Sequence, residues 1–337
     1  MTTPILQLDH VSKIFGSRKS YTVALDDMSL ALSAESASII TVAGESGSGK
    51  TTIGMLLLGF YAPTYGQVLY NGKNIADLDR EGMWQYRREI QAVFQDPFAV
   101  YNPFYKVDNL LSIPIKNFKL AKSKTEAYEL MEDAFRRVGL RPEETLGRFP
   151  HQLSGGQRQR IAVARALLLK PKLLITDEPV SMVDASLRST ILKALRGINQ
   201  EFNIPILYIT HDLTTAYHVS DYIMILYLGS VMEAGNVSSI ITGPKHPYTQ
   251  LLVNSIPWPD PKLKWGNAEE IITKSKVAHK KITGCKFAPR CPHAFDLCAT
   301  KAPELYRTDD DRAVACYLYK DSPVLPREEL GSLFAKI

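Results

Sequence analysis

Cysteine is absent from the first 284 residues of this 337-residue chain, and all four cysteines lie between residues 285 and 316. The N-terminus, MTTPILQLDH, lacks the basic region and apolar run of a signal peptide. No apolar stretch, YIMILYL included, is long enough to cross a membrane. These absences argue against a secreted or membrane-spanning protein and predict a soluble chain made in the cytosol. Disulfides seldom persist there, so the cysteines are candidates for holding a metal or a cluster.

Acidic residues are absent from residues 271–290, which contain six Lys or Arg. The net charge of the whole chain is only +5, which does not by itself indicate nucleic acid. Phe287 is the only aromatic residue of this stretch, too few for a surface that stacks bases. We therefore expect no nucleic-acid partner. We interpret the stretch as a solvated basic linker that lies near anionic lipid headgroups.

Residues 1 to about 255 alternate between strand-like and helix-like segments, which predicts an α/β architecture. The runs ASIITVAG, KLLITDEP and IPILYITHD predict strands that end in polar residues, and residues 105–170 are mostly helical in pattern. YIMILYLGSVMEAG predicts a hairpin that turns at Gly229. We expect a large domain over residues 1–255 and a small extension over residues 256–337. Four prolines mark the linker between them: Pro247, Pro257, Pro259 and Pro261.

The segment GESGSGKT fits the pattern G-x-x-x-x-G-K-[ST] and directly follows the apolar run IITVA. Glycines let consecutive backbone N–H groups surround phosphate oxygens, and the helix that follows adds positive potential. Lys50 can then reach the outer phosphates, and the Thr51 hydroxyl can ligate Mg²⁺. The sequence therefore predicts an ATP site. Its loop residues are Gly44, Glu45, Ser46, Gly47, Ser48, Gly49, Lys50, Thr51 and Thr52.

Two acidic residues end the apolar run LLITDEP. Asp177 is placed to face the magnesium ion, and Glu178 can polarise an attacking water. Acidic residues also end strands as simple solvated caps, so this prediction depends on the phosphate loop.

The segment LSGGQRQRIAVARAL places a serine and paired glycines before a predicted helix, which is a second phosphate-binding device. One nucleotide does not need two such devices from one chain. We therefore expect two subunits paired head to tail, with this segment closing over ATP bound to the partner. Its residues are Ser154, Gly155, Gly156 and Gln157.

With these motifs the chain resembles the ATP-binding-cassette (ABC) ATPases from about residue 5 to 255. The resemblance implies an α/β P-loop nucleotide-binding domain with a RecA-like core, an antiparallel β subdomain and a helical signature subdomain at about residues 98–170. It implies that Gln95 contacts magnesium and water and transmits a signal to the transport partner. It also implies that His211 contacts the γ-phosphate. Asp184 occupies the D-loop position, although SMVDAS differs from the usual S-A-L-D. Phe15 matches the aromatic that stacks on adenine, with Tyr21 as a substitute.

Within that family the chain most resembles ATPase subunits of oligopeptide and dipeptide importers. The segments KHPYTQLLVNSIP and QDPFAVYNPFYKV carry this resemblance. It implies two membrane permeases, an identical or paralogous second ATPase and an extracytoplasmic solute-binding protein. The chain would lie at the cytoplasmic face of the cell membrane. Importers of oligosaccharides and of nickel remain alternatives. A further alternative, from another functional class, is a soluble iron–sulfur cassette ATPase that acts on ribosomes or nucleic acid.

The cysteine spacing, C-x5-C-x6-C-x17-C, lacks the two-residue knuckles typical of structural zinc sites. Spacing alone leaves zinc and iron–sulfur open, with unligated core cysteines as a further alternative. GCKFAPRCPHAFDLC followed by VACY resembles the C-terminal cluster segment of peptide-importer ATPases. The resemblance thus implies a small cysteine-rich C-terminal domain with one [4Fe–4S] cluster. We expect the cluster to act as a structural staple, because a tail of this size has a small core. A redox or zinc module is the weaker alternative. The expected ligands are Cys285, Cys291, Cys298 and Cys316.

Overall fold

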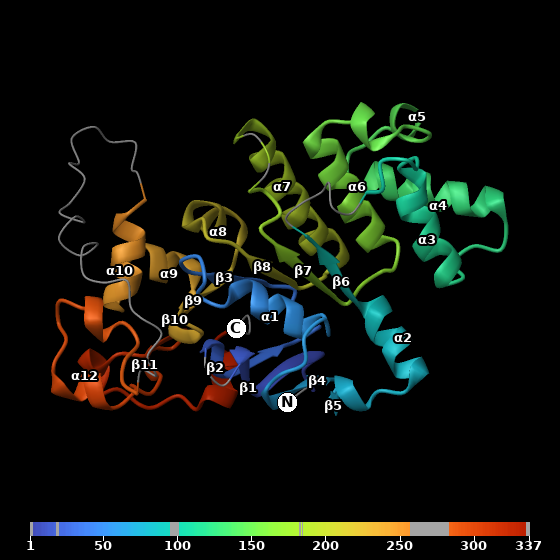
Figure 1. Cartoon of the computed structure of the whole chain (residues 1–337). Helices are drawn as coiled ribbons and strands as arrows, with labels where there is room; N and C mark the ends of the chain where they lie inside the picture. Colours follow the sequence, from blue (N-terminus) through green and yellow to red (C-terminus); the bar gives the residue numbers. More distant parts are fainter. Residues whose placement is uncertain are drawn as a thin grey trace. The chain divides into compact units, whose positions relative to one another are not determined.

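The computed structural model describes residues 3–17, 20–94, 101–181, 183, 185–256 and 283–334, without the side chains of residues 185–187. The chain forms two compact units (Figure 1). Unit 1 combines Met1–Asp77 with Tyr208–Ile337, and unit 2 is Leu78–Leu207. None of the helices within these described ranges is long and apolar enough to cross a bilayer.

The first sheet of unit 1 is antiparallel, with strand order β2-β1-β4-β5. Its long strands β1 (Leu6–Ser17) and β2 (Ser20–Leu32) pair over most of their length, and β4 (Tyr65–Tyr70) pairs with the other edge of β1. The short β5 (Lys73–Asn74) completes the sheet before the 3-10 turn η1 (Ile75–Asp77). The fully buried side chains of Leu6, Leu8 and Val11 anchor β1. This sheet is the predicted antiparallel β subdomain.

A second sheet region of unit 1 carries the phosphate loop. The strand β3 (Ile39–Ala43) is entirely buried and runs parallel to β9 (Tyr222–Tyr227). The chain then turns at Gly229, with φ 77°, into the antiparallel β10 (Ser230–Asn236). The predicted strand and hairpin are therefore confirmed. The helices of this region are α1 (Lys50–Leu57), α8 (Leu213–Val219), α9 (Val237–Thr242) and α10 (Pro247–Asn254).

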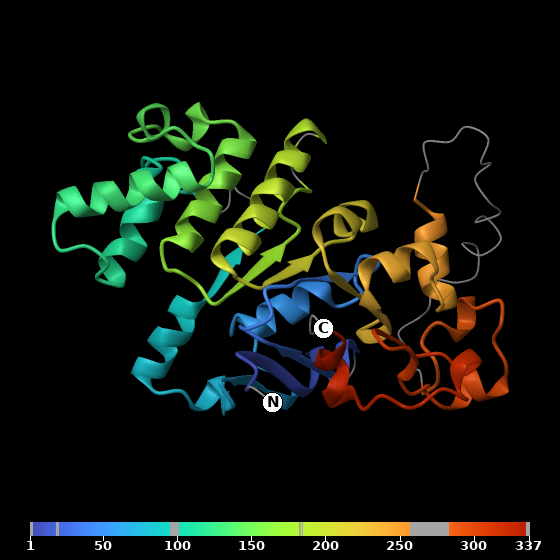
Figure 2. The same cartoon turned by 180° about the vertical axis from the view of Figure 1, so that it is seen from behind.

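The end of the chain is built into unit 1. The strand β12 (Arg312–Val314) pairs antiparallel with β10, and β11 (Tyr306–Asp309) pairs with β12. The 3-10 helix η5 (Arg327–Phe334) packs against β2, as Figure 2 shows for the red end of the chain and the blue strands. The shorter elements are η3 (Ala288–Arg290), α12 (Asp296–Thr300) and η4 (Tyr317–Tyr319).

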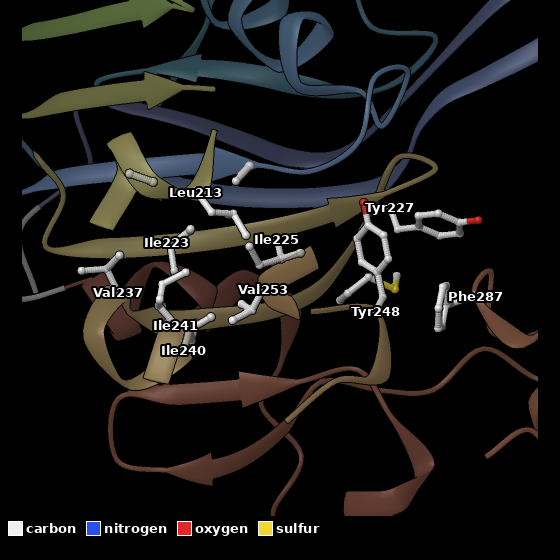
Figure 3. Close-up of a cluster of buried hydrophobic side chains, with 13 residues drawn as sticks. Leu213, Ile223, Ile225, Tyr227, Val237, Ile240, Ile241, Tyr248, Val253 and Phe287 are labelled. Atoms are coloured by element: carbon white, nitrogen blue, oxygen red, sulfur yellow. The ribbon is translucent and has the colours of Figure 1, made fainter. Parts of the chain in front are cut away.

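One apolar cluster joins these parts of unit 1 (Figure 3). It runs from Ala43, at the end of β3, through Ile223 and Ile225 of β9 to Tyr248 of α10. Phe287 enters it from the cysteine-bearing segment and is 1% exposed. The strand before the phosphate loop and the segment between the first two cysteines therefore share one core.

Unit 2 contains a pair of parallel strands and a group of helices. The helix α2 (Arg80–Glu89) leads into β6 (Ile90–Val93), which pairs with β7 (Leu173–Asp177). The predicted helices of residues 105–170 are α3 (Asp108–Asn117), α4 (Lys124–Arg137), α5 (Pro142–Thr145) and α6 (Gly155–Leu167), with the 3-10 turn η2 (Pro150–Gln152) before α6. The long α7 (Ala185–Phe202) follows β7, and the chain passes into unit 1 within β8 (Ile206–Ile209).

Candidate nucleotide site and cysteine cavity

The phosphate loop follows β3 directly and depends on glycine for its path. Gly44 has φ 150°, and a Cβ atom there would lie 2.2 Å from the Leu226 carbonyl oxygen. Gly49 has φ 104°, and its Cβ would lie 2.4 Å from the Ala24 carbonyl oxygen. Side chains at either position would collide with backbone. The glycines thus let the loop pass close to β2 and β9.

The polar groups of the loop suit an anionic ligand. Lys50 is 6% exposed, and its Nζ donates to the carbonyl oxygens of Gly44 and Glu45, both at 2.8 Å. Ser48 Oγ is buried and has no hydrogen-bond partner among the described residues. No side chain caps the N-terminus of α1, so its first N–H groups remain available to a phosphate. Thr51 is exposed at the start of this helix.

Phe15 and His211, the other predicted site residues of unit 1, are accessible. Phe15 is 37% exposed, and its ring packs edge-on against Tyr61 with centroids 5.4 Å apart. Lys13 Nζ lies 5.0 Å from the centroid of the Phe15 ring. Tyr21, the substitute, is 43% exposed. His211 is exposed in the turn between β8 and α8.

The acidic pair of unit 2 lies at the end of β7. Asp177 is its last residue and Glu178 follows, both half-buried. Glu178 has φ 45°, a left-handed conformation that is uncommon for residues other than glycine. Its carbonyl oxygen accepts hydrogen bonds from the backbone N–H of Ser181 at 3.2 Å and from the Ser181 hydroxyl at 3.0 Å. Backbone strain of this kind concentrates at functional sites.

The signature segment of unit 2 begins α6. Ser154 Oγ accepts from the Gln157 N–H at 3.2 Å, and Gln157 Oε1 accepts from the Ser154 N–H at 2.9 Å. This reciprocal pair is a capping box, which fixes the first turn of the helix. Ser154 is exposed, and a Cβ atom on Gly155 would meet nothing within 4 Å. The capping box thus fixes the first turn of α6, with Ser154 exposed, Gly155 and Gln157 half-buried and Gly156 buried.

Several predicted features lie outside the described residues: Gln95, Asp184, the linker prolines Pro257, Pro259 and Pro261, and residues 271–282 of the basic stretch.

All four cysteines line one small cavity of unit 1. The Cys285 N–H donates to the Cys298 carbonyl oxygen at 2.7 Å, and the Cys291 N–H donates to the Ala288 carbonyl oxygen at 3.2 Å. Cys316 follows Ala315, whose N–H donates to the Met232 carbonyl oxygen of β10 at 2.8 Å. None of the four cysteines forms a disulfide. Tight turns and a strand thus bring residues from four positions in the sequence to one cavity.

Burial makes three of these thiols weaker acids than a free cysteine. It raises the pKa of the Cys316 thiol to about 11 and also raises those of the Cys285 and Cys291 thiols. Within the described part of the chain, no group of three or more His, Cys, Asp or Glu side chains is arranged to hold a metal ion. What the cavity offers is a set of four sulfur donors, the set required by an all-cysteine cluster.

The prediction of a solvated basic linker is wrong for the two basic residues of this stretch that the structure describes. Lys286 Nζ lies 3.0 Å from Asp26 Oδ2, and the Lys286 side chain is 12% exposed. Arg290 forms an ion pair with Glu45 of the phosphate loop, and its side chain is 16% exposed. The local charge of residues 271–290 could not predict these two ion pairs, because the acidic partners, Asp26 and Glu45, lie in the N-terminal part of the chain. Neither is a linker residue.

Tyr248 is a further site residue that sequence reasoning missed. Its hydroxyl oxygen accepts from the Glu45 N–H at 2.9 Å. His246 is the N-cap residue of α10, and its Nδ1 accepts a hydrogen bond from the Tyr248 N–H at 3.0 Å. The segment KHPYTQ contains Tyr248 and carries part of the resemblance to importer subunits, but that resemblance assigns it no role.

Comparison with known proteins places this fold and site in a class. The ABC transporter family model matches residues 25–181, and the model of the oligopeptide/dipeptide transporter C-terminal region matches residues 232–298. The dimeric, ADP- and phosphate-bound cassette MJ0796 is 27% identical, with a TM-score of 0.60 over 69% of this chain and 98% of its own. CbiO1 of Clostridium perfringens is also 27% identical, with a TM-score of 0.61 over 72% of this chain and 92% of its own.

Longer matches come from two proteins of Bacillus subtilis. The putative oligopeptide transport ATP-binding protein YkfD is 35% identical over 95% of this chain and 97% of its own. The oligopeptide transport ATP-binding protein AppF is 37% identical over 94% and 97%. The chain belongs to the ATP-binding proteins of the ABC transporter family. Within them it belongs to the oligopeptide/dipeptide transport group.

Proposed function

We propose that this chain is the ATP-hydrolysing subunit of a membrane importer of the peptide-uptake type. The observation that carries the proposal is the phosphate loop, in which Lys50 Nζ is held by two loop carbonyl oxygens and the start of α1 has no side-chain cap. The relatives named above are oligopeptide transport ATP-binding proteins that match over nearly their whole length, which supports peptide as the solute.

The principal predicted residues have the following roles in this function. Lys50 and the loop N–H groups bind the phosphates, and the Thr51 hydroxyl and Asp177 carboxylate would hold Mg²⁺, with Gln95. Bound magnesium supplies charge neutralisation of the phosphate oxygens. Glu178 accepts a hydrogen bond from the attacking water and takes its proton, while His211 donates to the γ-phosphate. Phe15 packs against adenine.

The same proposal includes a multi-subunit assembly. The exposed Ser154 of the signature segment, Ser154 to Gln157, supports closure over ATP bound to a second ATPase subunit, and we propose that this subunit is a paralogue. Two membrane permeases would contact unit 2, where Phe104 is 86% exposed, Tyr105 55% and Ile113 49%. An extracytoplasmic solute-binding protein would deliver the solute, and this chain would lie at the cytoplasmic face of the membrane. Residues 1–255 act as the motor and residues 256–337 as its extension.

Reconstitution tests the function. The chain should co-purify with hydrophobic permeases from membranes, and proteoliposomes that hold the complex and its binding protein should accumulate a labelled peptide when ATP is supplied. Lys50→Ala should abolish this uptake, because the phosphate site loses its cation. Peptide should compete for uptake, whereas an oligosaccharide or Ni²⁺ should not. Recovery of the chain with ribosomes in place of permeases would contradict the proposal.

We further propose that Cys285, Cys291, Cys298 and Cys316 hold one [4Fe–4S] cluster with a structural role. The support is chemical: one cavity, four thiols and no disulfide among them. When bound, the cluster would cross-link the turns that carry the four cysteines.

Metal analysis tests the cluster. Protein purified anaerobically should be brown and contain about four irons and four sulfides per chain. Colourless protein with stoichiometric zinc would contradict the assignment. The structural role predicts that Cys298→Ser makes residues 283–334 sensitive to protease. If that variant kept a protease-resistant segment while only wild-type transport responded to redox conditions, the role would be regulatory.

A further inference from the structure

Arg290 connects the cysteine-bearing segment directly to the phosphate loop. Its Nη1 donates to Glu45 Oε2 at 3.0 Å, and its Nη2 donates to Glu45 Oε1 at 3.1 Å. This two-pronged geometry gives both strength and orientation to an arginine–carboxylate pair. The two residues are 245 positions apart in the sequence, and both belong to unit 1. The segment that holds the cysteines therefore contacts the second residue of the ATP-binding loop.

The guanidinium group of Arg290 is itself held in place. Its Cζ lies 5.7 Å from the ring centroid of Tyr227 and 5.6 Å from that of Phe287. Nη1 also donates to the Tyr227 hydroxyl oxygen at 3.3 Å. Phe287 is almost fully buried in the apolar cluster shown in Figure 3, and its ring packs edge-on against Tyr227. Such fixed surroundings reduce the entropy lost when the ion pair forms.

Glu45 is held through its backbone as well as its side chain. Its N–H donates to the Tyr248 hydroxyl oxygen at 2.9 Å, and its carbonyl oxygen accepts from Lys50 Nζ at 2.8 Å. Lys50 is the cation expected to bind the outer phosphates. Release of the Glu45 side chain would therefore loosen a residue that also positions Lys50.

We propose that Arg290 is a positioning residue of the ATP site, which fixes the phosphate loop through Glu45 and makes nucleotide affinity depend on the cysteine-bearing segment. Arg290 ends η3 and precedes Cys291, and the Arg290 N–H donates to the Phe287 carbonyl oxygen at 2.9 Å. Disorder in this turn would withdraw the guanidinium from Glu45. The dependence on the segment rests on the proposed iron–sulfur function, whereas the role of Arg290 toward Glu45 does not.

A double-mutant cycle on the full-length chain, purified anaerobically, tests the positioning role. The measurement is the dissociation constant of Mg-ADP by calorimetry. Arg290→Ala and Glu45→Gln should each weaken binding roughly three- to tenfold, and the double variant should be no weaker than either single one, because both remove the same contact. Arg290→Lys should recover only part of the loss, since lysine keeps the charge without the fork.

Arg327→Ala is the matched control. Arg327 also joins the C-terminal region to the N-terminal part of the chain, with Nη1 3.1 Å from Asp27 Oδ2, but none of its described ion pairs involves the phosphate loop. This variant should bind Mg-ADP as the wild type does. Wild-type affinity in Arg290→Ala, or losses that multiply in the double variant, would overturn the positioning role. If Arg290→Ala does not fold, the double-mutant cycle can be measured with Arg290→Lys in its place, together with Glu45→Gln and the corresponding double variant.

Iron removal tests the dependence on the segment. Anaerobic chelation of iron should weaken Mg-ADP binding to the wild type by about the same factor as Arg290→Ala. It should leave the affinity of Arg290→Ala unchanged, because that variant has already lost the contact. Unchanged wild-type affinity after measured iron loss would overturn the dependence. If the purified chain contains no iron, the proposed cluster is wrong, and the cycle alone decides the role of Arg290.

Discussion

At the scale of single residues, Glu178 combines a carboxylate with a strained backbone at the end of a buried strand. We expect Glu178→Gln in the assembled complex to bind ATP and to hydrolyse it about 100-fold more slowly or worse, because glutamine cannot take a proton from water. Phosphate release and equilibrium binding of ATP measure the two effects. Lys50→Ala is the contrasting variant, since it should weaken binding itself. Wild-type turnover in Glu178→Gln would contradict its role as the base.

His10 makes a residue-scale prediction about pH. Its Nδ1 lies 2.7 Å from Asp27 Oδ1 and its Nε2 lies 2.6 Å from Glu328 Oε1. Hydrogen bonds to Asp27 and then to Glu328 raise the pKa of His10 above 6.5. A raised pKa means that this stabilisation is complete below about pH 6.5 and is lost as the pH rises through the folded-state value. All three side chains are about half exposed, so the contribution is modest.

Thermal unfolding of His10→Ala checks this effect. The variant should melt below the wild type at about pH 6, and the difference should shrink by about pH 9. A difference in melting temperature that grows with pH would have the wrong sign for the proposed ion pairs.

At the scale of elements, α6 carries the prediction about dimer closure. Ser154→Arg removes the cap, which costs about 1 kcal/mol, and places a bulky cation where the signature is open. Ser154→Ala removes the same cap without the bulk. We expect the arginine variant to block ATP-driven pairing of the ATPase subunits, measured by sedimentation, and the alanine variant, which loses only the hydroxyl, to weaken it. Both variants should bind ATP at their own phosphate loop. Loss of that binding in Ser154→Arg would contradict head-to-tail geometry.

The elements differ in how far the sequence could predict them. β3, the phosphate loop and the hairpin at Gly229 follow from local patterns, because apolar runs and glycines act on their neighbours in the chain. The pairing of β12 with β10 could not be predicted, since three residues carry too little pattern to specify a partner. The contacts of Arg290 and Tyr248 could not be predicted either, because both residues bind Glu45, which lies more than 200 positions away in the sequence. Local sequence predicts elements, whereas contacts between distant segments complete the site.

At the scale of the whole molecule, the C-terminal segment contributes to the core of unit 1. Phe287 is 1% exposed, and its ring centroid lies 5.5 Å from that of Tyr227 and 5.4 Å from that of Tyr248. Phe295, in the same segment, is 46% exposed. Because one phenylalanine is buried and the other is half-exposed, replacing each by alanine distinguishes the effect of burial from the effect of losing a phenylalanine.

We expect Phe287→Ala to destabilise unit 1 by about 3–5 kcal/mol, the usual cost of emptying a buried aromatic site. Phe295→Ala should cost about 1 kcal/mol or less, because much of its ring already contacts water. Hydrogen exchange measures both, and the amides of β9 and β10 should lose protection in Phe287→Ala alone, although they lie some fifty residues or more from the substitution. The phosphate loop should exchange faster in the same variant, since Phe287 supports Arg290 and shares a cluster with Ala43. Exchange confined to residues 283–334 would instead mean that the segment is an appendage whose folding does not stabilise the motor.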